Sequence, residues 1–232
     1  MKLFYAPHIL TDSELPAEEA VHAVKVLRLK PGDELTIVDG VGNFHDARVA
    51  HTDGRQRCRV ELIATRPQAP QWEGHRHIAL APTKNADRME WLVEKATEIG
   101  VDEVSFLDCR YSERKAMKTD RLQRVAISAI KQSLKARLPQ LNAMTDFRAF
   151  VSQPRSGGKF IAPCHEGEKP LLQDCLTDGG DATILIGPEG DFSTEEVELA
   201  VQCGYIPVSL GKSRLRTETA ALVACTILSL HG

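Results

Sequence analysis

The chain has 232 residues, of which 42% are hydrophobic, 26% charged and 5% aromatic, and its formal net charge is −3. That length suffices for one large domain, or for a small domain joined to a larger one, each with a hydrophobic core. No run of about 18 apolar residues is present, which excludes a membrane-spanning helix, and the first residues lack the apolar core of a signal peptide. The near-neutral charge argues against a protein that coats nucleic acid. We expect a soluble, globular, cytoplasmic protein.

Six cysteines are spread along the chain, and no two of them lie within four residues of each other. Structural zinc sites usually draw their ligands in close pairs, so this spacing predicts no bound metal. A chain of this length without a signal peptide does not need disulfides for stability. We expect reduced, mostly buried thiols at Cys58, Cys109, Cys164, Cys175, Cys203 and Cys225.

The first 66 residues show short strand patterns separated by turns, together with one helix. Residues 16–27 form the predicted helix, because Pro16 stands at its entry and apolar residues follow at helical spacing. Several short antiparallel strands with turns between them are typical of a small barrel or sandwich. The proline-bearing residues 66–71 then indicate a linker. The strands are expected at residues 35–38, 44–49 and 58–62.

Beyond this linker the pattern changes to strands that alternate with helices. Such alternation predicts an α/β domain with a mainly parallel sheet and helices on both of its faces. We expect strands at residues 78–81, 104–107, 160–162, 183–186 and 207–210, and helices at residues 86–99, 120–135, 194–203 and 217–230.

Three of the predicted strands are followed by unusual loops, at residues 163–167, 187–192 and 211–219. In open α/β sheets, ligands bind beyond the carboxyl ends of the strands. Gly187 and Gly190 flank a proline and would let the backbone approach a flat ligand, although glycine and proline are also the default residues of ordinary turns. No P-loop, dinucleotide fingerprint or G-x-S-x-G elbow is present, which disfavours those functions.

Charge is unevenly distributed along the chain. Residues 110–137 hold nine Lys or Arg against two acidic residues, a net charge of +7, whereas residues 166–200 carry a net charge of −9. A basic run is usually a solvated helix face, but residues 110–118 precede the predicted helix in a loop, where such a cluster can bind phosphates. The net charge of the whole chain therefore conceals a candidate RNA-facing patch. Arg214, Arg216 and Glu218 could form solvated ion pairs or act in catalysis, and Thr217 fits a helix N-cap.

The loop sequences resemble a known family. Leu-Ile-Gly-Pro-Glu-Gly at residues 185–190, followed by Leu-Arg-Thr-Glu-Thr-Ala at residues 215–220, closely resembles the RsmE family of ribosomal RNA methyltransferases, which belongs to the SPOUT superfamily. Residues 22–28, 94–101 and 112–114 agree with the family's other motifs in order, so the resemblance spans nearly the whole chain. The chain departs from the family at Asp191 and Leu134, where glycine is common, and at residues 212–214, where Pro-Arg-Ile is usual.

The resemblance implies a PUA-like RNA-binding β-barrel over residues 1–67. For residues 73–232 it implies a SPOUT methyltransferase domain, an α/β domain with a parallel sheet and a deep trefoil knot. It also implies a homodimer that binds S-adenosyl-L-methionine in the knot loops and methylates N3 of one uridine in 16S ribosomal RNA, either free or in the small ribosomal subunit.

From this resemblance we assign roles to individual residues. Arg216 would stabilise the negative charge that the uracil base acquires on losing its N3 proton. Glu218 would orient Arg216, accept the proton, or serve only the start of the last helix. The residues assigned to the cofactor are Ile186, Gly187, Gly190, Leu210, Gly211 and Leu215, and those assigned to RNA are Arg28, Arg110, Arg114 and Lys115.

Three other functions compete with this hypothesis. A non-catalytic RNA-binding protein would keep the barrel and the basic run but would not need the glycine-bearing loops. A SPOUT enzyme could instead methylate a ribose 2′-oxygen or another base position. A hydrolase that uses Glu189 and Asp191 has only the closeness of these two carboxylates in its favour.

Overall fold

The computed structural model describes residues 2–231, which form two units that we describe separately. The first unit comprises Met1–Pro70 together with Ile127–Leu138, and the second comprises Gln71–Ala126 and Pro139–Gly232. The described helices are all too short or too polar to cross a membrane. All six cysteines are free, and three of them, Cys58, Cys109 and Cys225, are buried.

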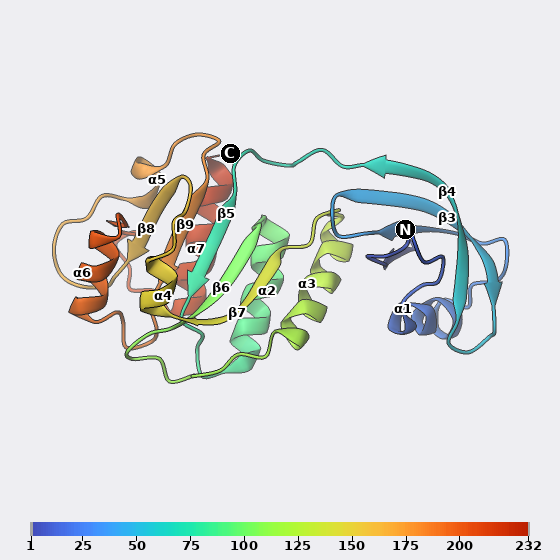
Figure 1. Ribbon diagram of the computed structural model, residues 1–232, viewed down its shortest axis with the longest axis horizontal. Coiled ribbons are helices and arrows are strands. Elements are labelled where there is room, and N and C mark those ends of the chain that lie inside the picture. The colour runs from blue at the N-terminus through green and yellow to red at the C-terminus, as the bar shows by residue number, and fades with distance from the viewer. Residues whose placement is uncertain (1, 232) are drawn as a thin grey trace. The chain divides into compact units, whose positions relative to one another are not determined.

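The first unit contains a four-stranded sheet in the order β1-β2-β3-β4, of which β3 and β4 are labelled in Figure 1. The hairpin strands pair in antiparallel fashion, as their alternating sequences predict, and Phe4, Ile37 and Val49 lie fully buried in the core beneath them. The first strand was not predicted, because three residues are too few to show a period, and it pairs in parallel with β2. The strands are β1 (Leu3–Tyr5), β2 (Glu34–Val38), β3 (Asn43–Thr52) and β4 (Cys58–Pro67).

The predicted helix at residues 16–27 is divided into two parts. It begins as α1 (Ala17–Val21) and continues as the π-helix η1 (His22–Val26). The wider turn of a π-helix is frequently found at functional sites. The helix ends at Leu27, and Arg28 then adopts a left-handed backbone conformation with φ 55°.

The segment Ile127–Leu138 belongs to the first unit although it follows the second unit's first strands in the sequence. It contains the end of α3 (Thr119–Ser133). Ile130 and Ala136 are completely buried and form a small apolar cluster with Val38 of β2, and Tyr5 packs against that cluster. This apolar contact explains why the first unit extends beyond the expected linker.

A six-stranded sheet in the order β10-β8-β9-β5-β6-β7 forms the second unit, and all of its strands are parallel. The predicted central strands are present, and β9 is buried along its whole length. The edge strand β7 was not predicted, because its residues alternate little in polarity and none of them is fully buried. The strands are β5 (Arg76–Leu80), β6 (Glu103–Asp108), β7 (Gln140–Asp146), β8 (Gly158–Ala162), β9 (Ala182–Ile186) and β10 (Ile206–Pro207).

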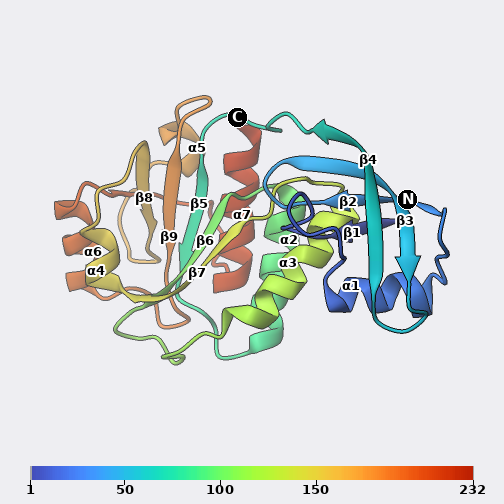
Figure 2. The same cartoon turned by 45° about the vertical axis from the view of Figure 1, so that its right-hand side comes forward.

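Helices cover both faces of this sheet, as predicted (Figure 2). On one face, α7 (Thr217–Leu230) packs against β5, β9 and α2 (Ala86–Ile99). On the other, α4 (Phe147–Val151) packs against α6 (Thr194–Gln202) and the strands β6 and β7. The short α5 (Leu172–Cys175) follows β8. Because every strand points the same way, the loops after β8, β9 and β10 emerge at one edge of the sheet.

Candidate active site

Two cavities lie at the carboxyl ends of the strands β8, β9 and β10. The first cavity, of about 510 Å³, is lined by the end of β8 and the loop after it, by Asp191 from the loop after β9, and by residues 208–215 after β10. The second cavity, of about 520 Å³, contains three guanidinium groups and two carboxylates. It is lined by Arg88, Cys164, Pro188, Glu189, Asp191, Arg214, Leu215, Arg216 and Thr217.

Four residues line both cavities: Cys164, Asp191, Arg214 and Leu215. The two cavities therefore adjoin each other, and we call these four residues the shared wall. A ligand in one cavity and a ligand in the other would meet at this wall. Such an arrangement suits the transfer of a group between two bound molecules.

The first residue of α7, directly after the loop that follows β10, is anchored to the start of the loop after β9. Thr217 donates a hydrogen bond from Oγ1 to the carbonyl oxygen of Gly187, at 3.0 Å in a buried position. Its expected role as N-cap is wrong: Arg216 occupies the N-cap position without a side-chain cap, and Thr217 is the first helical residue. The Thr217 hydroxyl thus holds two cavity-forming loops together instead of capping α7.

Asp191 holds the loop after β8 against the loop after β9. The backbone N–H of Cys164 donates to Oδ2 of Asp191 at 2.9 Å, and Nε2 of His165 lies 3.5 Å from the same oxygen. Nε2 of His165 donates to the carbonyl oxygen of Phe192 at 2.8 Å. Asp191 has a φ of 66°, a left-handed conformation that aspartate tolerates better than most residues. Desolvation of the sulfur, followed by the Asp191 carboxylate, raises the pKa of the Cys164 thiol.

Arg88 lies between two carboxylates at the start of α2. Its Nη1 is 3.5 Å from Oε1 of Glu218 and 3.6 Å from Oε1 of Glu189. Glu218 is only 6% exposed, lines neither cavity, and has one buried oxygen without a hydrogen-bond partner. The structure therefore pairs Glu218 with Arg88, and an ion pair with Arg216 is absent from the described residues. Arg88 was not predicted as a site residue, although its place in the first turn of the predicted helix 86–99, which follows the strand 78–81, was a usable signal.

Only some of the residues assigned to the cofactor line the first cavity. Leu210, Gly211 and Leu215 do, whereas Ile186, Gly187 and Gly190 do not. The two glycines are closely packed: a Cβ would lie 3.1 Å from a ring carbon of Phe192 at Gly187 and 3.1 Å from the Cβ of Tyr111 at Gly190, so these neighbours would have to shift to admit a side chain. Gly211 differs from both: its φ is 128°, and a Cβ there would meet no atom within 4 Å.

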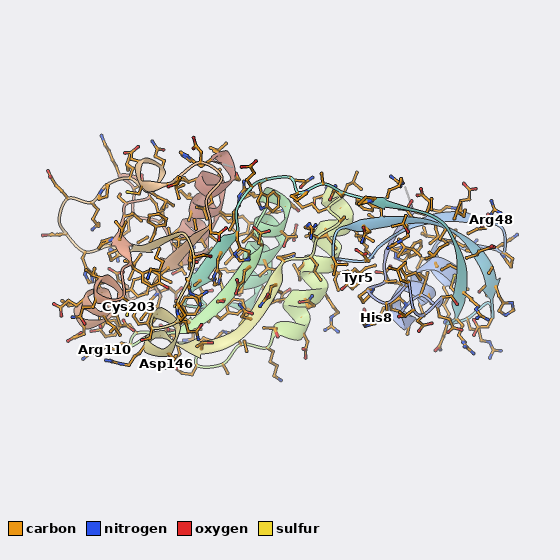
Figure 3. All side chains as sticks on the ribbon, turned by 45° about the horizontal axis from the view of Figure 1, so that its top comes forward. Tyr5, His8, Arg48, Arg110, Asp146 and Cys203 are labelled. Atoms are coloured by element: carbon orange, nitrogen blue, oxygen red, sulfur yellow. The ribbon has the colours of Figure 1, made fainter. Side chains whose placement is uncertain are left out.

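The basic residues assigned to RNA in the loop after β6 are engaged within the second unit. Arg110 (Figure 3) forms an ion pair with Glu195 at 3.1 Å, and Lys115 forms one with Asp108 at 2.7 Å. Arg114 donates hydrogen bonds to the carbonyl oxygens of Thr83 and Lys84, at 3.2 and 2.7 Å. Arg114 thus holds its loop against the loop before α2, while the other two remain more than half exposed.

Arg28, the fourth residue assigned to RNA, lies in the first unit directly after the π-helix. It is exposed and has a strained backbone, a feature that clusters at functional sites. No group of His, Cys, Asp or Glu side chains that could hold a metal ion occurs within residues 2–231.

Two family models match the chain. A model described as an RNA methyltransferase domain matches residues 70–229, and a model described as an RNA methyltransferase PUA domain matches residues 15–63. The first match covers more than half of the chain and contains both cavities.

The chain is similar over nearly its whole length to proteins with related names. It is 29% identical to the ribosomal RNA small subunit methyltransferase E of Mycobacterium bovis, over 89% of this chain and 82% of that protein. The crystal structure of a probable rRNA-methyltransferase from Porphyromonas gingivalis has a TM-score of 0.94 at 46% identity, covering 100% of this chain and 98% of its own. A ribosomal RNA small subunit methyltransferase E from Neisseria gonorrhoeae, bound to S-adenosyl methionine, has a TM-score of 0.87 at 27% identity, with 99% and 97% covered.

Proposed function

The chain belongs to the RsmE family of RNA methyltransferases, and we propose that it transfers a methyl group from S-adenosyl-L-methionine to N3 of one uridine in 16S ribosomal RNA. The observation that carries this proposal is the pair of adjoining cavities in the unit that matches the methyltransferase model. One cavity would take the methyl donor and the other the target base. Their shared wall would surround the point of transfer.

The first cavity suits the methyl donor in size and in chemistry. Its volume of about 510 Å³ lies in the range of small-molecule sites, about 300–1,000 Å³. Leu210 and Leu215 offer apolar surface to the adenine ring, and Lys169 offers a cation to the donor's carboxylate. The open space beside the Gly211 backbone would allow a ligand to approach it closely. Ile186, Gly187 and Gly190 would act by fixing the shape of the loop after β9.

The bound cofactor supplies an electrophilic methyl group, whose in-line transfer depends mainly on positioning. Uracil N3 is a weak acid, so the protein must also stabilise the negative charge that forms on the base. We assign this role to Arg216, which lines the second cavity and donates no hydrogen bond to another described residue. Glu218 would hold Arg88, which lines the same cavity as Arg216.

RNA binding would involve both units. Arg28, Arg110 and Lys115 are exposed cations that could neutralise phosphates, and Arg114 would fix the loop that presents two of them. We propose a homodimer and a trefoil knot in the loops of the second unit, both on the basis of the family resemblance. The buried tie between Thr217 and Gly187 is consistent with a compact loop crossing there. Ribosomal RNA as substrate would place the enzyme in the cytoplasm.

Mapping of the methylated nucleotide tests the proposal. The purified protein is incubated with labelled S-adenosylmethionine and either free 16S ribosomal RNA or small subunits from a strain that lacks the gene. Nuclease digestion and mass spectrometry should then locate one N3-methyluridine, which should be missing from the deletion strain and restored with the gene. Methylation of a ribose 2′-oxygen would replace the proposal with the second hypothesis. Failure to bind the methyl donor in calorimetry would favour a non-catalytic RNA-binding protein.

A further inference from the structure

We propose that Tyr111 stacks on the RNA base next to the target uridine and thereby favours RNA in which that base is unstacked. This inference rests on the proposed function and deepens it, because it names a specificity-determining residue that lines neither cavity. Tyr111 lies in the loop after β6 and is 49% exposed. Single exposed apolar side chains are common on proteins, so the assignment depends on what surrounds Tyr111.

Entry of the target base into the second cavity creates a need for an aromatic partner. A base that is taken out of its stack leaves the nucleotide beside it without one of its stacking partners. Proteins that bind single-stranded RNA supply the missing partner with Phe, Tyr or Trp rings, on which unstacked bases lie flat. Every base has a π-face, so Tyr111 would recognise an unstacked strand and would not read one particular base.

Tyr111 packs against the loop that borders the second cavity. A Cβ at Gly190 would lie 3.1 Å from the Cβ of Tyr111 and 3.7 Å from its Cγ. Glu189 and Asp191, which precede and follow Gly190 in the sequence, both line that cavity. If the target base fills the second cavity, an adjacent nucleotide of the same strand would therefore pass close to Tyr111.

The loop holds Tyr111 in an ordered turn. The backbone N–H of Ser112 donates to the carbonyl oxygen of Cys109 at 3.0 Å, and the N–H of Cys109 donates to Oγ of Ser112 at 2.9 Å. Directly before Tyr111, the N–H of Arg110 donates to Oε1 of Glu196 at 2.8 Å. A side chain on a turn that is already ordered loses less conformational freedom on binding, which favours affinity.

The charges around Tyr111 indicate that its partner is a nucleic acid. Residues 110–118 carry four Lys or Arg against one acidic residue. Cζ of Arg110 lies 5.6 Å from the centroid of the Tyr111 ring. The ion pair of Arg110 with Glu195 is exposed on both sides, and such pairs are weak enough for a phosphate to replace the carboxylate. An aromatic ring flanked by cations matches the alternating bases and phosphates of a single strand.

The substitution Tyr111→Ala tests the assignment, because alanine keeps the Cβ that packs beside Gly190 and removes the ring. The probe is a synthetic RNA fragment that contains the methylated uridine. Its affinity, measured by fluorescence anisotropy, should fall by about 5–150-fold, the usual effect of losing one base–aromatic stack. Tyr111→Phe keeps the ring and should retain most of the affinity.

Val201→Ala is the matched control. Val201 is 47% exposed in α6 and lines neither cavity, so its truncation removes a similarly exposed apolar side chain of the same unit. The affinity of this variant for the RNA fragment should equal that of the wild type. Calorimetry and thermal unfolding should show that Tyr111→Ala still binds S-adenosylmethionine and remains folded.

A fluorescent base shows directly whether the ring stacks. 2-Aminopurine, whose fluorescence is quenched by stacking, replaces the nucleotide on the 5′ side of the target uridine and then the one on the 3′ side. At one of these positions the signal should stay quenched in the wild-type complex and rise in the Tyr111→Ala complex. An abasic residue at that position should weaken binding to the wild type and cause no further loss in Tyr111→Ala.

Other results would overturn the assignment. Equal affinities of the wild type and Tyr111→Ala would exclude stacking, and so would additive losses from the abasic residue and the alanine. An unfolded Tyr111→Ala, or an equal loss in Val201→Ala, together with unquenched 2-aminopurine at both positions in the wild-type complex, would leave Tyr111 a structural role only. These binding measurements need no methyl transfer, and mass spectrometry locates the methyl group separately. A failure of the proposed function is therefore distinguishable from a failure of this inference.

Discussion

The polar side chains at the two ends of the parallel sheet in the second unit differ in their partners: at the amino ends they bond to one another, and at the carboxyl ends they line cavities. At the amino ends of the strands, His77, Ser105, Asn142, Glu103 and Arg155 form an amino-end cluster. Nε2 of His77 is 2.8 Å from Oγ of Ser105, and Asn142 donates to Ser105 and to Glu103. Nδ1 of His77 lies 3.3 Å from Nη1 of Arg155. None of these five residues lines either of the two cavities described above, and they bind mainly one another.

At the carboxyl ends, by contrast, the charged side chains line two cavities and have few partners. Arg214 and Arg216 donate no hydrogen bonds to other described residues, and Arg88 is held by carboxylates at 3.5 to 3.6 Å. Arg214 and Arg216 are exposed, so water solvates their guanidinium groups and a ligand can replace it, whereas the polar groups of the amino-end cluster are bonded mainly to one another. The charged side chains at the carboxyl ends are therefore the more accessible of the two sets, independently of any motif.

The largest effect is expected from Gly190→Val at the ligand-binding end. The new side chain would collide with Tyr111 and displace the loop that carries Glu189 and Asp191. Binding of S-adenosylmethionine in calorimetry should be lost. Gly54→Ala is the control, since it lies at a positive φ in open space of the first unit and should lower stability by about 1 kcal/mol without affecting binding. Normal binding of S-adenosylmethionine by Gly190→Val would show that cofactor binding does not depend on the shape of the loop after β9.

Arg216→Ala tests whether an exposed cation at the same end acts on the reaction. Loss of a group that stabilises charge in the transition state typically lowers turnover by about 10²–10³-fold. Cofactor affinity should remain nearly unchanged, because Arg216 lines only the second cavity. Steady-state kinetics together with calorimetry measure both quantities, and Arg148→Ala on the exposed side of α4 provides the control. An equal loss in turnover and in cofactor affinity would reject the role of Arg216 in catalysis.

His77 tests the opposite end through the pH dependence of stability. Burial lowers the pKa of His77 to about 3, whereas in the unfolded chain its pKa is about 6.5. Between these two pH values the unfolded state therefore binds a proton at His77 and the folded state does not. The free energy of unfolding should therefore be fully retained above pH 6.5 and fall by up to about 1.4 kcal/mol per pH unit between there and pH 3. His77→Gln should flatten this part of the curve in urea titrations. His75→Gln, at a half-exposed neighbour, should keep the wild-type slope.

The smallest effect is expected from removing the Ser193 hydroxyl, which is hydrogen-bonded within the protein at the carboxyl end of the sheet. Ser193 and Glu196 form a reciprocal capping box at the start of α6. Ser193→Ala should cost about 1 kcal/mol of stability, measured by thermal unfolding, and should leave cofactor binding unchanged because Ser193 lines neither cavity. Weaker cofactor binding in Ser193→Ala would contradict the expectation that Ser193 contributes to stability alone.

Much of the fold could be predicted because local signals agreed with tertiary packing. The helix at residues 86–99 has the predicted bounds, since the Asn85 side chain caps its start and Gly100, with φ 127°, ends it. The elements that were missed, β1, β7, α4 and α5, are short or lie at sheet edges, where packing and not periodicity decides the structure.

The sequence indicated which loops form the candidate site, but it did not show that these loops line two separate cavities. The rule that ligands bind at the carboxyl ends of strands pointed to the loops that line the two cavities. That Asp191 and Arg214 line two cavities at once depends on three loops meeting in space, which no spacing reveals. The departures from the family pattern were informative in retrospect. Asp191 and Leu134, which replace common glycines, have φ values of 66° and 55°, so the chain keeps the backbone turn that glycine would favour.

The assignment of Ile127–Leu138 to the first unit bears on how the protein is synthesised. A chain that leaves the ribosome from its N-terminus exposes the apolar side chains of Leu3, Tyr5 and Phe44 long before Ile130 and Leu138 arrive to cover them. The first unit can therefore be completed only after more than half of the polypeptide has been made. Nascent chains shorter than 138 residues should carry an uncovered apolar surface, and chaperones that bind such surfaces would have their longest access to the protein during this interval.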